Sequence, residues 1–171
     1  MSNATETQVE TVDLRDLLNK PLSDFPDLPD LPAGKHFYGK LIGIKADHSR
    51  DKKTPFFNFS VRLTDPGEDV TDVEKNAITN AGFSLADYQC GANFYLTPNA
   101  MRILRRFLSS LGFPDSASFR EALSLDPETG NPTPESVEKI RGLDVLVKLP
   151  AAGDNGRVYL QNVDRIDGVK R

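Results

Sequence analysis

Residues 56–64 alternate between apolar and polar side chains, and this alternation constrains what the chain can fold into. A period of two is typical of a β-strand with one buried face and one solvent-facing face. Each apolar side chain that is buried contributes about 1.5–3 kcal/mol. A slip of one residue would turn all of them outward, so the register is firmly determined. The side chains expected inside are Phe57, Phe59, Val61 and Leu63.

The preceding run, residues 37–47, is also strand-like but is interrupted by glycines. Its apolar side chains do not keep a single parity. A bulge or bend near Gly43 would bring Phe37, Leu41 and Ile44 to one side, and glycine inside a strand often marks such a bend. We therefore expect a curved first strand.

The two strands are joined by a polar, cation-rich loop, residues 47–55, which ends at Pro55. Proline is tolerated at the first position of a strand, and short polar residues are typical of turns. The sequence therefore predicts a β-hairpin with a basic tip. The solvent-facing side of its second strand would carry Phe56, Asn58 and Arg62.

Composition limits the class of protein. The chain has 171 residues, 38% of them hydrophobic and 27% charged, which suits one globular domain with polar appendages. No stretch approaches the roughly 18 apolar residues that a membrane span needs, and residues 1–6 do not resemble a secretion signal. Cys90 is the single cysteine, so an intramolecular disulfide is impossible and an intracellular protein is expected.

Charge is unevenly distributed around a net value of −4. Residues 1–34 hold seven acidic residues against two basic ones, whereas residues 35–63 hold seven basic residues against two acidic ones. Further basic clusters occur within residues 102–106 and 157–171. The net charge argues against indiscriminate polyanion binding, but the distribution allows a local cationic site. A solvated surface of mixed charge is the alternative for any one cluster.

Residues 1–32 read as an acidic arm: residues 1–11 are expected to be disordered, residues 12–20 could form two helical turns, and residues 21–32 contain four prolines. Prolines at this density prevent a helix or a central strand. We expect an extended segment that acts as a linker or a recognition peptide. A strap that packs on the domain's own surface is the alternative. The apolar side chains available for either role are Phe25, Leu28 and Leu31.

Helices and three further strands are expected after the hairpin. The predicted helices span 73–80, 98–111 and 134–141, with a looser segment at 116–125, and the predicted strands span 92–96, 143–149 and 157–163. This order favours a mostly β fold with helices (α+β), namely a five-stranded OB-fold barrel with a helical insertion between strands 3 and 4. A small SH3-like barrel is the alternative. The domain would span residues 33–167, between the arm at 1–32 and a basic tail at 168–171.

Several motifs carry a resemblance to a known family: Leu31-Pro32-Ala33-Gly34, Lys53-Thr54-Pro55, Pro66-Gly67-Glu68-Asp69-Val70 and Asn93-Phe94-Tyr95-Leu96-Thr97-Pro98. Over residues 31–165 this pattern resembles small bacteriophage OB-fold proteins found among replication and recombination genes, of unassigned or proposed single-stranded-DNA-binding function. The resemblance implies an OB-fold, single-stranded DNA handling, viral origin and a place in the host cytoplasm. It carries over no catalytic residue.

Signatures of catalysis and metal binding are weak. Gly34-Lys35 is followed by His36 rather than by serine or threonine, so it does not match a phosphate-binding loop. His36 and His48 have no cysteine or carboxylate grouping at metal-ligand spacing. Asp30 and Asp51 imitate a nuclease metal pattern, but an arm and a loop tip would not hold a metal site in place. We expect no enzyme, no metal and no cofactor.

Binding of single-stranded nucleic acid has a clearer physical route. Such a site needs cations along a groove and aromatic faces on which bases stack, each stack worth about 1–3 kcal/mol. With about five phosphates neutralised, log affinity should fall against log salt with a slope of about −3.5. The residues expected to contact DNA are Tyr38, Lys40, Lys45, Arg50, Lys52, Lys53, Phe56, Asn58, Arg62, Tyr95, Arg157 and Tyr159.

The sequence predicts a single-stranded DNA-binding protein, and the resemblance implies a role in phage replication or recombination. The arm is similar in composition to the acidic tails of bacterial single-stranded DNA-binding proteins, which implies that it recruits replication or recombination proteins or occupies the basic groove. The competing expectation is a structural or adaptor protein that uses the arm in a virion or multi-protein assembly. Either could be an oligomer, and neither involves a membrane.

Overall fold

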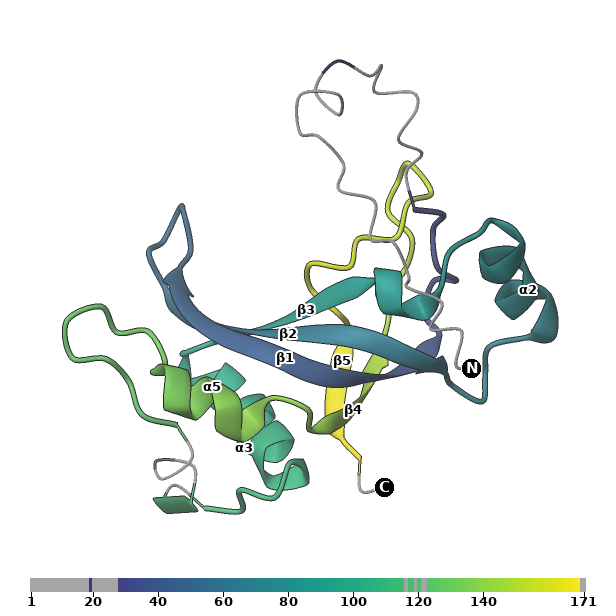
Figure 1. The fold of residues 1–171 in the computed structure, drawn as a ribbon. Coiled ribbons are helices and arrows are strands. Elements are labelled where there is room, and N and C mark those ends of the chain that lie inside the picture. The colour runs from purple at the N-terminus through teal and green to yellow at the C-terminus, as the bar shows by residue number, and fades with distance from the viewer. Residues whose placement is uncertain (1–18, 20–27, 116, 119, 121–122, 170–171) are drawn as a thin grey trace, which may run out of the picture.

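One antiparallel sheet of five strands organises the protein, in the order β3-β2-β1-β4-β5 (Figure 1). The computed structural model describes residues 19, 28–115, 117–118, 120 and 123–169. The structure is a mixed α/β protein, as the sequence predicts in outline. The strands are β1 (His36–His48), β2 (Pro55–Pro66), β3 (Gln89–Tyr95), β4 (Asp144–Lys148) and β5 (Arg165–Gly168).

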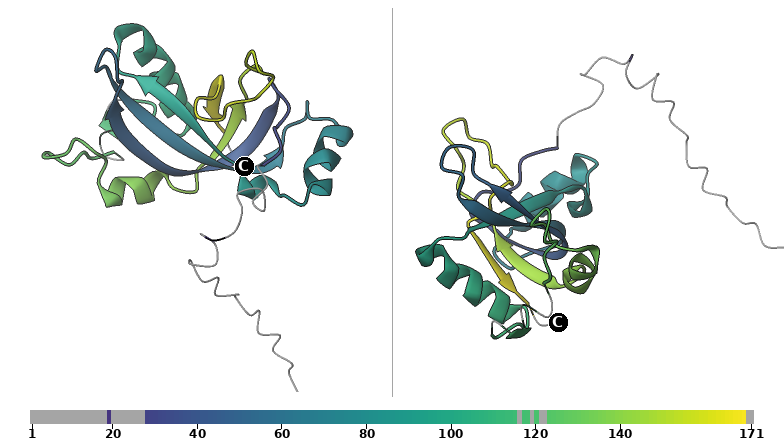
Figure 2. Two further views of the ribbon diagram at one scale, coloured as in Figure 1. Left: turned by 90° about the horizontal axis from the view of Figure 1, so that it is seen from above. Right: turned by 90° about the vertical axis from the view of Figure 1, so that its left-hand side faces the viewer.

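The β1–β2 hairpin confirms the prediction from alternation. Every apolar side chain expected inside β2 is buried, and the register shifts in β1 between Leu41 and Gly43. That shift brings Phe37, Leu41 and Ile44 into the core, as the predicted bend requires. A second shift, beside Gly39, went unpredicted: a Cβ there would stand 2.7 Å from the Arg62 carbonyl oxygen. The long hairpin is strongly curved as a result (Figure 2).

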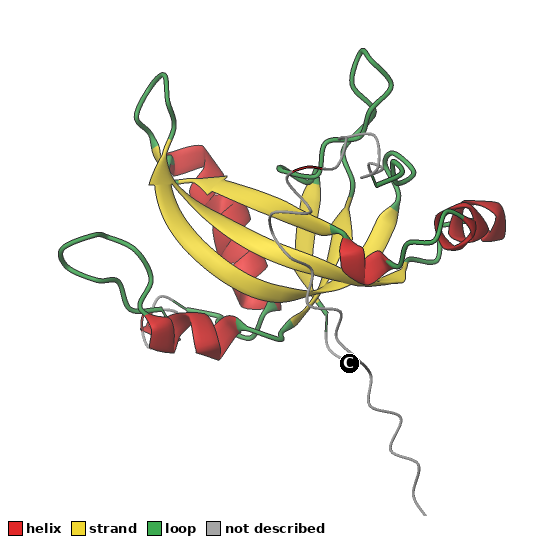
Figure 3. Ribbon diagram, turned by 45° about the horizontal axis from the view of Figure 1, so that its top comes forward, coloured by secondary structure: helices red, strands yellow, loops and turns green. Residues whose placement is uncertain are grey.

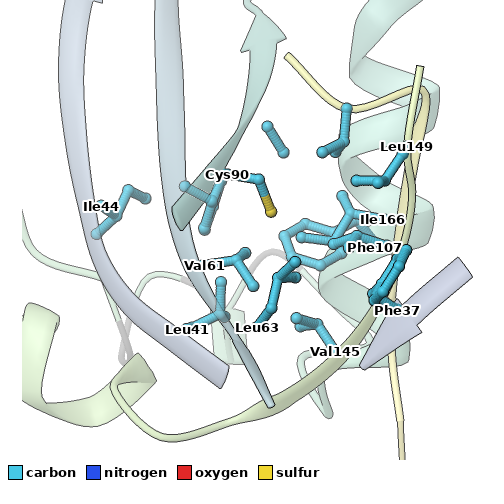
Figure 4. Close-up of a cluster of buried hydrophobic side chains, with 14 of the residues drawn as sticks. Phe37, Leu41, Ile44, Val61, Leu63, Cys90, Phe107, Val145, Leu149 and Ile166 are labelled. Carbon is cyan, nitrogen blue, oxygen red and sulfur yellow. The ribbon is translucent and has the colours of Figure 1, made fainter. Parts of the chain in front are cut away.

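The core lies between the curved sheet and helix α3 (Pro98–Ser110) (Figure 4). The hydroxyl oxygen of Thr97 accepts a hydrogen bond from the Ala100 amide, and proline occupies the first helical position. The ring of Phe107 stacks on Phe94 at 5.2 Å and meets Phe59 edge-on at 5.1 Å. Such aromatic pairs add about 0.5–1.5 kcal/mol each beyond the area they bury. Helix α3 is therefore fastened to β2 and β3 together.

The sheet is not closed into a barrel, so the predicted OB barrel is not confirmed. The edge strands β3 and β5 are instead linked through other parts of the chain. At one end the Gly91 amide donates to the Leu160 carbonyl at 2.7 Å, and the Val163 amide donates to the Gly91 carbonyl at 2.8 Å. At the other end the Gly168 amide donates to the Ser110 hydroxyl at 2.7 Å. The last turn of α3 therefore covers the free edge of β5.

The predicted fifth strand, residues 157–163, was wrong in position. The hydrogen bonds of residues 160–163 reach β3 at Gly91 and at Asn93, two residues further on. Pairing with β4 begins where the Asp164 amide donates to the Lys148 carbonyl. The strand at this edge is β5, which starts at Arg165. Alternation in the sequence predicts that a segment is extended, but it does not show which of its residues pair with β4.

The remaining helices confirm two predictions. Helix α2 (Asp72–Asn80) begins at a capping box between Thr71 and Glu74, and helix α5 (Pro134–Ile140) is capped by Thr133. A short 3-10 helix, η2 (Leu85–Asp87), precedes β3. The predicted segment at 116–125 lies partly outside the described residues, as does the arm up to residue 27 apart from residue 19.

Candidate nucleic-acid interface

The outward face of β2 and β3 carries an aromatic pair beside an asparagine pair. Phe56 lies opposite Tyr95 in the strand register, and Asn58 lies opposite Asn93. The two rings are 5.2 Å apart and tilted by 50°. Phe56 is half-buried and Tyr95 is 38% exposed, so both present ring surface on the side of the sheet away from the core.

A pocket of about 400 Å³ lies over this face, beside the residues that link β3 to the loop after β4. We call it the carboxamide pocket, because four of its lining side chains are amides. Asn58 Nδ2 donates to Asn93 Oδ1 at 2.6 Å across the strand pair. The polar side chains that line the pocket are Lys45, Asp47, Asn58, Ser60, Gln89, Asn93 and Gln161.

The basic loop between β1 and β2 is a closed, hydrogen-bonded turn. The Ser49 amide donates to the Thr54 carbonyl at 2.9 Å, the Lys53 amide donates to the Ser49 carbonyl at 3.0 Å, and the Thr54 amide donates to the Ser49 hydroxyl at 3.0 Å. Lys53 has φ +50°, in the left-handed region that residues with a Cβ rarely adopt. These bonds hold the backbone of the tip in one arrangement.

A second hollow, of about 710 Å³, lies under that loop. We call it the loop pocket. Phe56 and Asp47 line both pockets and so lie between them, while Tyr95 and Thr97 line the loop pocket from β3 and the residues that follow it. The two hollows are therefore one interrupted groove with an aromatic side chain at its middle.

Four cations of this region make no ion pair with any described residue: Lys45, Arg50, Lys52 and Lys53. All four are exposed. Asp47 and Asp51 lie in the same segment and offset part of their charge. The local field is therefore positive although the whole chain is acidic.

The other predicted contact residues are less well placed. Lys40 forms an ion pair with Asp144 at 3.2 Å and lies opposite Arg62, on the same face but outside both pockets. Tyr38 is half-buried, further along β1. These residues extend the face of the sheet rather than the groove itself.

Arg157 and Tyr159 lie on the loop between β4 and β5, and both are exposed. The Tyr159 hydroxyl accepts a hydrogen bond from Asn155 Nδ2 at 2.7 Å, so this side chain is turned toward its own loop. The β1–β2 loop and the β4–β5 loop project from the same side of the sheet (Figure 3). The curved sheet lies between these two loops (Figure 3).

Two predicted residues of the arm fall on described positions. Leu31 is 2% exposed and belongs to the protein's own core, where a partner could not contact it. Leu28 is 38% exposed, and between the two the Pro29 carbonyl accepts a 2.6 Å hydrogen bond from the Tyr88 hydroxyl. Residues 29–31 are thus a strap on the domain, which was the alternative considered for the arm. Phe25 lies outside the described residues.

Sequence reasoning missed three amides of the groove. Asn93 shares the parity of Tyr95 on β3, so the outward side of that strand could have indicated it. Gln89, at the start of β3, has the same parity as these two residues. Gln161 reaches the pocket only through the tertiary link at Gly91, for which the sequence holds no local signal.

No family model matches this chain, and the comparison with curated proteins finds no match either.

Within the described residues, no three histidine, cysteine or acidic side chains gather as a metal site would require. Burial raises the pKa of the Cys90 thiol to about 12, so this thiol stays protonated and is a poor nucleophile. Helices long and apolar enough to cross a bilayer are also absent from this part of the chain.

Proposed function

We propose that the protein is a non-enzymatic single-stranded DNA-binding protein that uses the outward face of β2 and β3. The observation that carries this proposal is Phe56, a half-buried aromatic side chain that separates a pocket of neutral amides from a hollow under unpaired cations. A single strand needs this combination, because its bases stack on aromatic faces while its phosphates require positive charge. We place the protein in phage replication or recombination, acting in the host cytoplasm.

The architecture supports an OB-like interpretation of the sheet. β1 is central and pairs with both β2 and β4, and α3 lies between β3 and β4 in the chain. The bonds of Gly91 with Leu160 and Val163 join the two edges where strand pairing would close a barrel. In OB-folds the face of strands 2 and 3, with the loops 1–2 and 4–5, is the usual site for oligonucleotides. Both pockets lie on that face.

Electrostatics set the expected salt dependence. Lys40 is paired with Asp144, which leaves four unpaired cations near the groove. Each phosphate neutralised on a single strand contributes about −0.7 to the slope of log affinity against log salt, so four give a slope of about −2.8. The slope predicted from the sequence was steeper because it counted Lys40 as a fifth cation free to neutralise a phosphate.

Titration of a fluorescent thymidine oligonucleotide over a range of salt concentrations tests the proposal. Wild type should bind with the stated salt slope, and Phe56→Ala should weaken binding by about 1–3 kcal/mol, the value of one lost stack. The double reversal Lys52→Glu with Lys53→Glu should weaken binding and flatten the slope. Arg102→Glu, which reverses an exposed cation of α3 outside both pockets, is the matched control and should leave affinity unchanged.

Absence of binding at about 50 mM salt, where electrostatic attraction is strong, would overturn the proposal. Stable assembly with another phage protein in that case would favour the structural or adaptor role.

A further inference from the structure

The two pockets differ in chemistry, and the difference indicates which part of a nucleotide each one suits. The loop pocket is lined by two cations that suit phosphate, Arg50 and Lys52, together with the carboxylates Asp47 and Asp51, and it holds no amide side chain. The carboxamide pocket holds one lysine and one aspartate, whose charges cancel, and four neutral amides. Amides carry donors and acceptors together, which is what the edge of a base presents.

The Asn58–Asn93 pair exposes a donor beside an acceptor. Asn58 Nδ2 already donates to Asn93 Oδ1 at 2.6 Å. The amino group of Asn93 has no acceptor among the described residues, and Asn58 Oδ1 receives only a long 3.4 Å contact from the Ser60 hydroxyl. If the oxygen and nitrogen atoms of both amides are exchanged, Asn93 becomes the donor to Asn58, and the pair still has one free donor and one free acceptor. The Watson–Crick edge of every base also carries at least one donor and one acceptor, so it can pair with these two groups.

We propose that the carboxamide pocket binds the Watson–Crick edge of one unpaired base, with Asn58 and Asn93 as the reading side chains. This inference rests on the proposed function and adds a reason for strand selectivity. In a duplex the same edges are occupied by the complementary strand, whereas an unpaired base offers them to the amides. Phe56, at the wall of the pocket, supplies the surface on which that base or its neighbour stacks.

A neutral oligosaccharide is the other polymer that aromatic and amide groups suit, and OB-folds bind both classes. The surroundings favour the nucleic acid. Phe56 also lines the loop pocket, so a chain that leaves the carboxamide pocket over this ring arrives among Arg50 and Lys52. A neutral sugar would gain nothing from those charges.

The experiment compares two oligonucleotides that differ only at the Watson–Crick edge of their bases. A thymidine oligonucleotide and its N3-methylthymidine counterpart have the same phosphates and similar stacking surfaces, but the methyl group removes the N3–H donor. Wild type should bind the methylated strand about tenfold more weakly, in the range expected for losing a base-edge contact. Asn93→Ala should lose about tenfold on the ordinary strand and show little further loss on methylation. Asn93→Asp keeps the acceptor that holds Asn58 in place but removes the donor to a thymine carbonyl, so it should also lose about tenfold on the ordinary strand and yet retain the methylation effect.

Asn131→Ala is the matched control, because Asn131 is an exposed asparagine on the loop before α5, outside both pockets, and it should retain the full methylation effect. Equal binding of the two strands by wild type would overturn the base-reading inference while leaving the proposed function intact. Loss of all strand binding would overturn both. Equally tight binding of free thymidine monophosphate, or displacement of the strand by a neutral oligosaccharide, would also refute the inference.

Discussion

A single residue of the basic loop, Lys53, combines an unfavourable backbone with a useful charge. At φ +50° a residue with a Cβ costs about 1–2 kcal/mol relative to a right-handed conformation. Asparagine tolerates this region better than lysine does. A lysine at this position is easier to understand if its charge serves binding.

We therefore expect Lys53→Asn to stabilise the protein by up to about 1 kcal/mol, which raises the unfolding midpoint by about 2–4 °C for a chain of this size. The same substitution should weaken binding of single-stranded DNA, because one phosphate contact is lost. Thermal unfolding and oligonucleotide titration measure the two effects. Lys52→Asn, at a neighbour without positive φ, should weaken binding with no gain in stability. Equal midpoints for the two variants would contradict the argument from backbone strain.

A second local interaction, between a carboxylate and a histidine, joins Asp69 to the start of β1. The Asp69 carboxylate lies 2.8 Å from His36 Nδ1 and accepts a 3.0 Å hydrogen bond from the His36 amide. The hydrogen bond with the His36 side chain is the main cause that lowers the pKa of Asp69 below its usual value. A carboxyl group whose pKa is lowered by folding contributes stability above its unfolded pKa, and that contribution is lost as the pH falls through the folded pKa.

We expect the wild-type midpoint to fall as the pH drops below the ordinary value of 3.8, and Asp69→Asn to remove part of that fall. The effect should be small because the pair is exposed and screened by solvent. Thermal unfolding between about pH 5 and pH 2 measures it. Identical pH profiles for wild type and Asp69→Asn would show that the pair does not contribute.

At the scale of elements, Gly91 determines how β3 meets the loop after β4. A Cβ on this residue would stand 2.7 Å from the Gln161 carbonyl oxygen and 3.0 Å from Asn58 Nδ2. The first distance is shorter than real Cβ contacts allow, and the nearby atom is backbone. Only glycine lets residues 160–163 bond to β3 on this edge.

Gly91→Ala should cost about 1–3 kcal/mol in the free energy of unfolding, as overpacking does. Hydrogen exchange at the Val163 amide should accelerate, because its bond to the Gly91 carbonyl would be displaced. Gly43→Ala is the control, since a Cβ at Gly43 meets no atom within 4 Å. Slow exchange at Val163 in the Gly91 variant would show that the link survives without glycine.

The elements that the sequence predicted correctly are those with local signals. Alternation placed β2, and threonine followed by proline at residues 97–98 and 133–134 placed the starts of α3 and α5. The predicted position of the fifth strand was wrong because residues 157–163 alternate in polarity but make no strand pairing beyond the bonds with Gly91. The predicted closure of the sheet into a barrel was not confirmed for a related reason. The last turn of α3, with its Ser110 hydroxyl, occupies the edge of β5 that would pair with another strand in a barrel.

At the scale of the whole molecule, the candidate site was predictable where it follows one hairpin and unpredictable where distant segments meet. The aromatic and cationic members, Phe56 and the tip of the basic loop, lie within one stretch of chain. Gln161 comes to the same pocket from more than a hundred residues beyond β1, through the Gly91 link. Lys40 was counted as a free cation because Asp144, its partner, lies on a strand whose pairing with β1 the sequence did not reveal.

The two faces of β2 separate the stability of the molecule from its proposed binding role. Phe59 is 1% exposed and contacts Phe94 and Phe107, so Phe59→Ala should cost about 3–5 kcal/mol in the free energy of unfolding. Phe56 lies three residues earlier on the opposite face and contacts one ring, that of Tyr95.

Phe56→Ala should therefore cost only about 0.5–1.5 kcal/mol of stability from the lost ring pair, while it removes the aromatic surface between the two pockets. Urea unfolding and oligonucleotide titration of both variants test this contrast. The Phe59 variant that remains folded should bind the strand as wild type does, because no residue of the groove has changed. A Phe56 variant as unstable as the Phe59 variant would mean that this ring serves the fold instead, and the proposed binding face would lose its central residue.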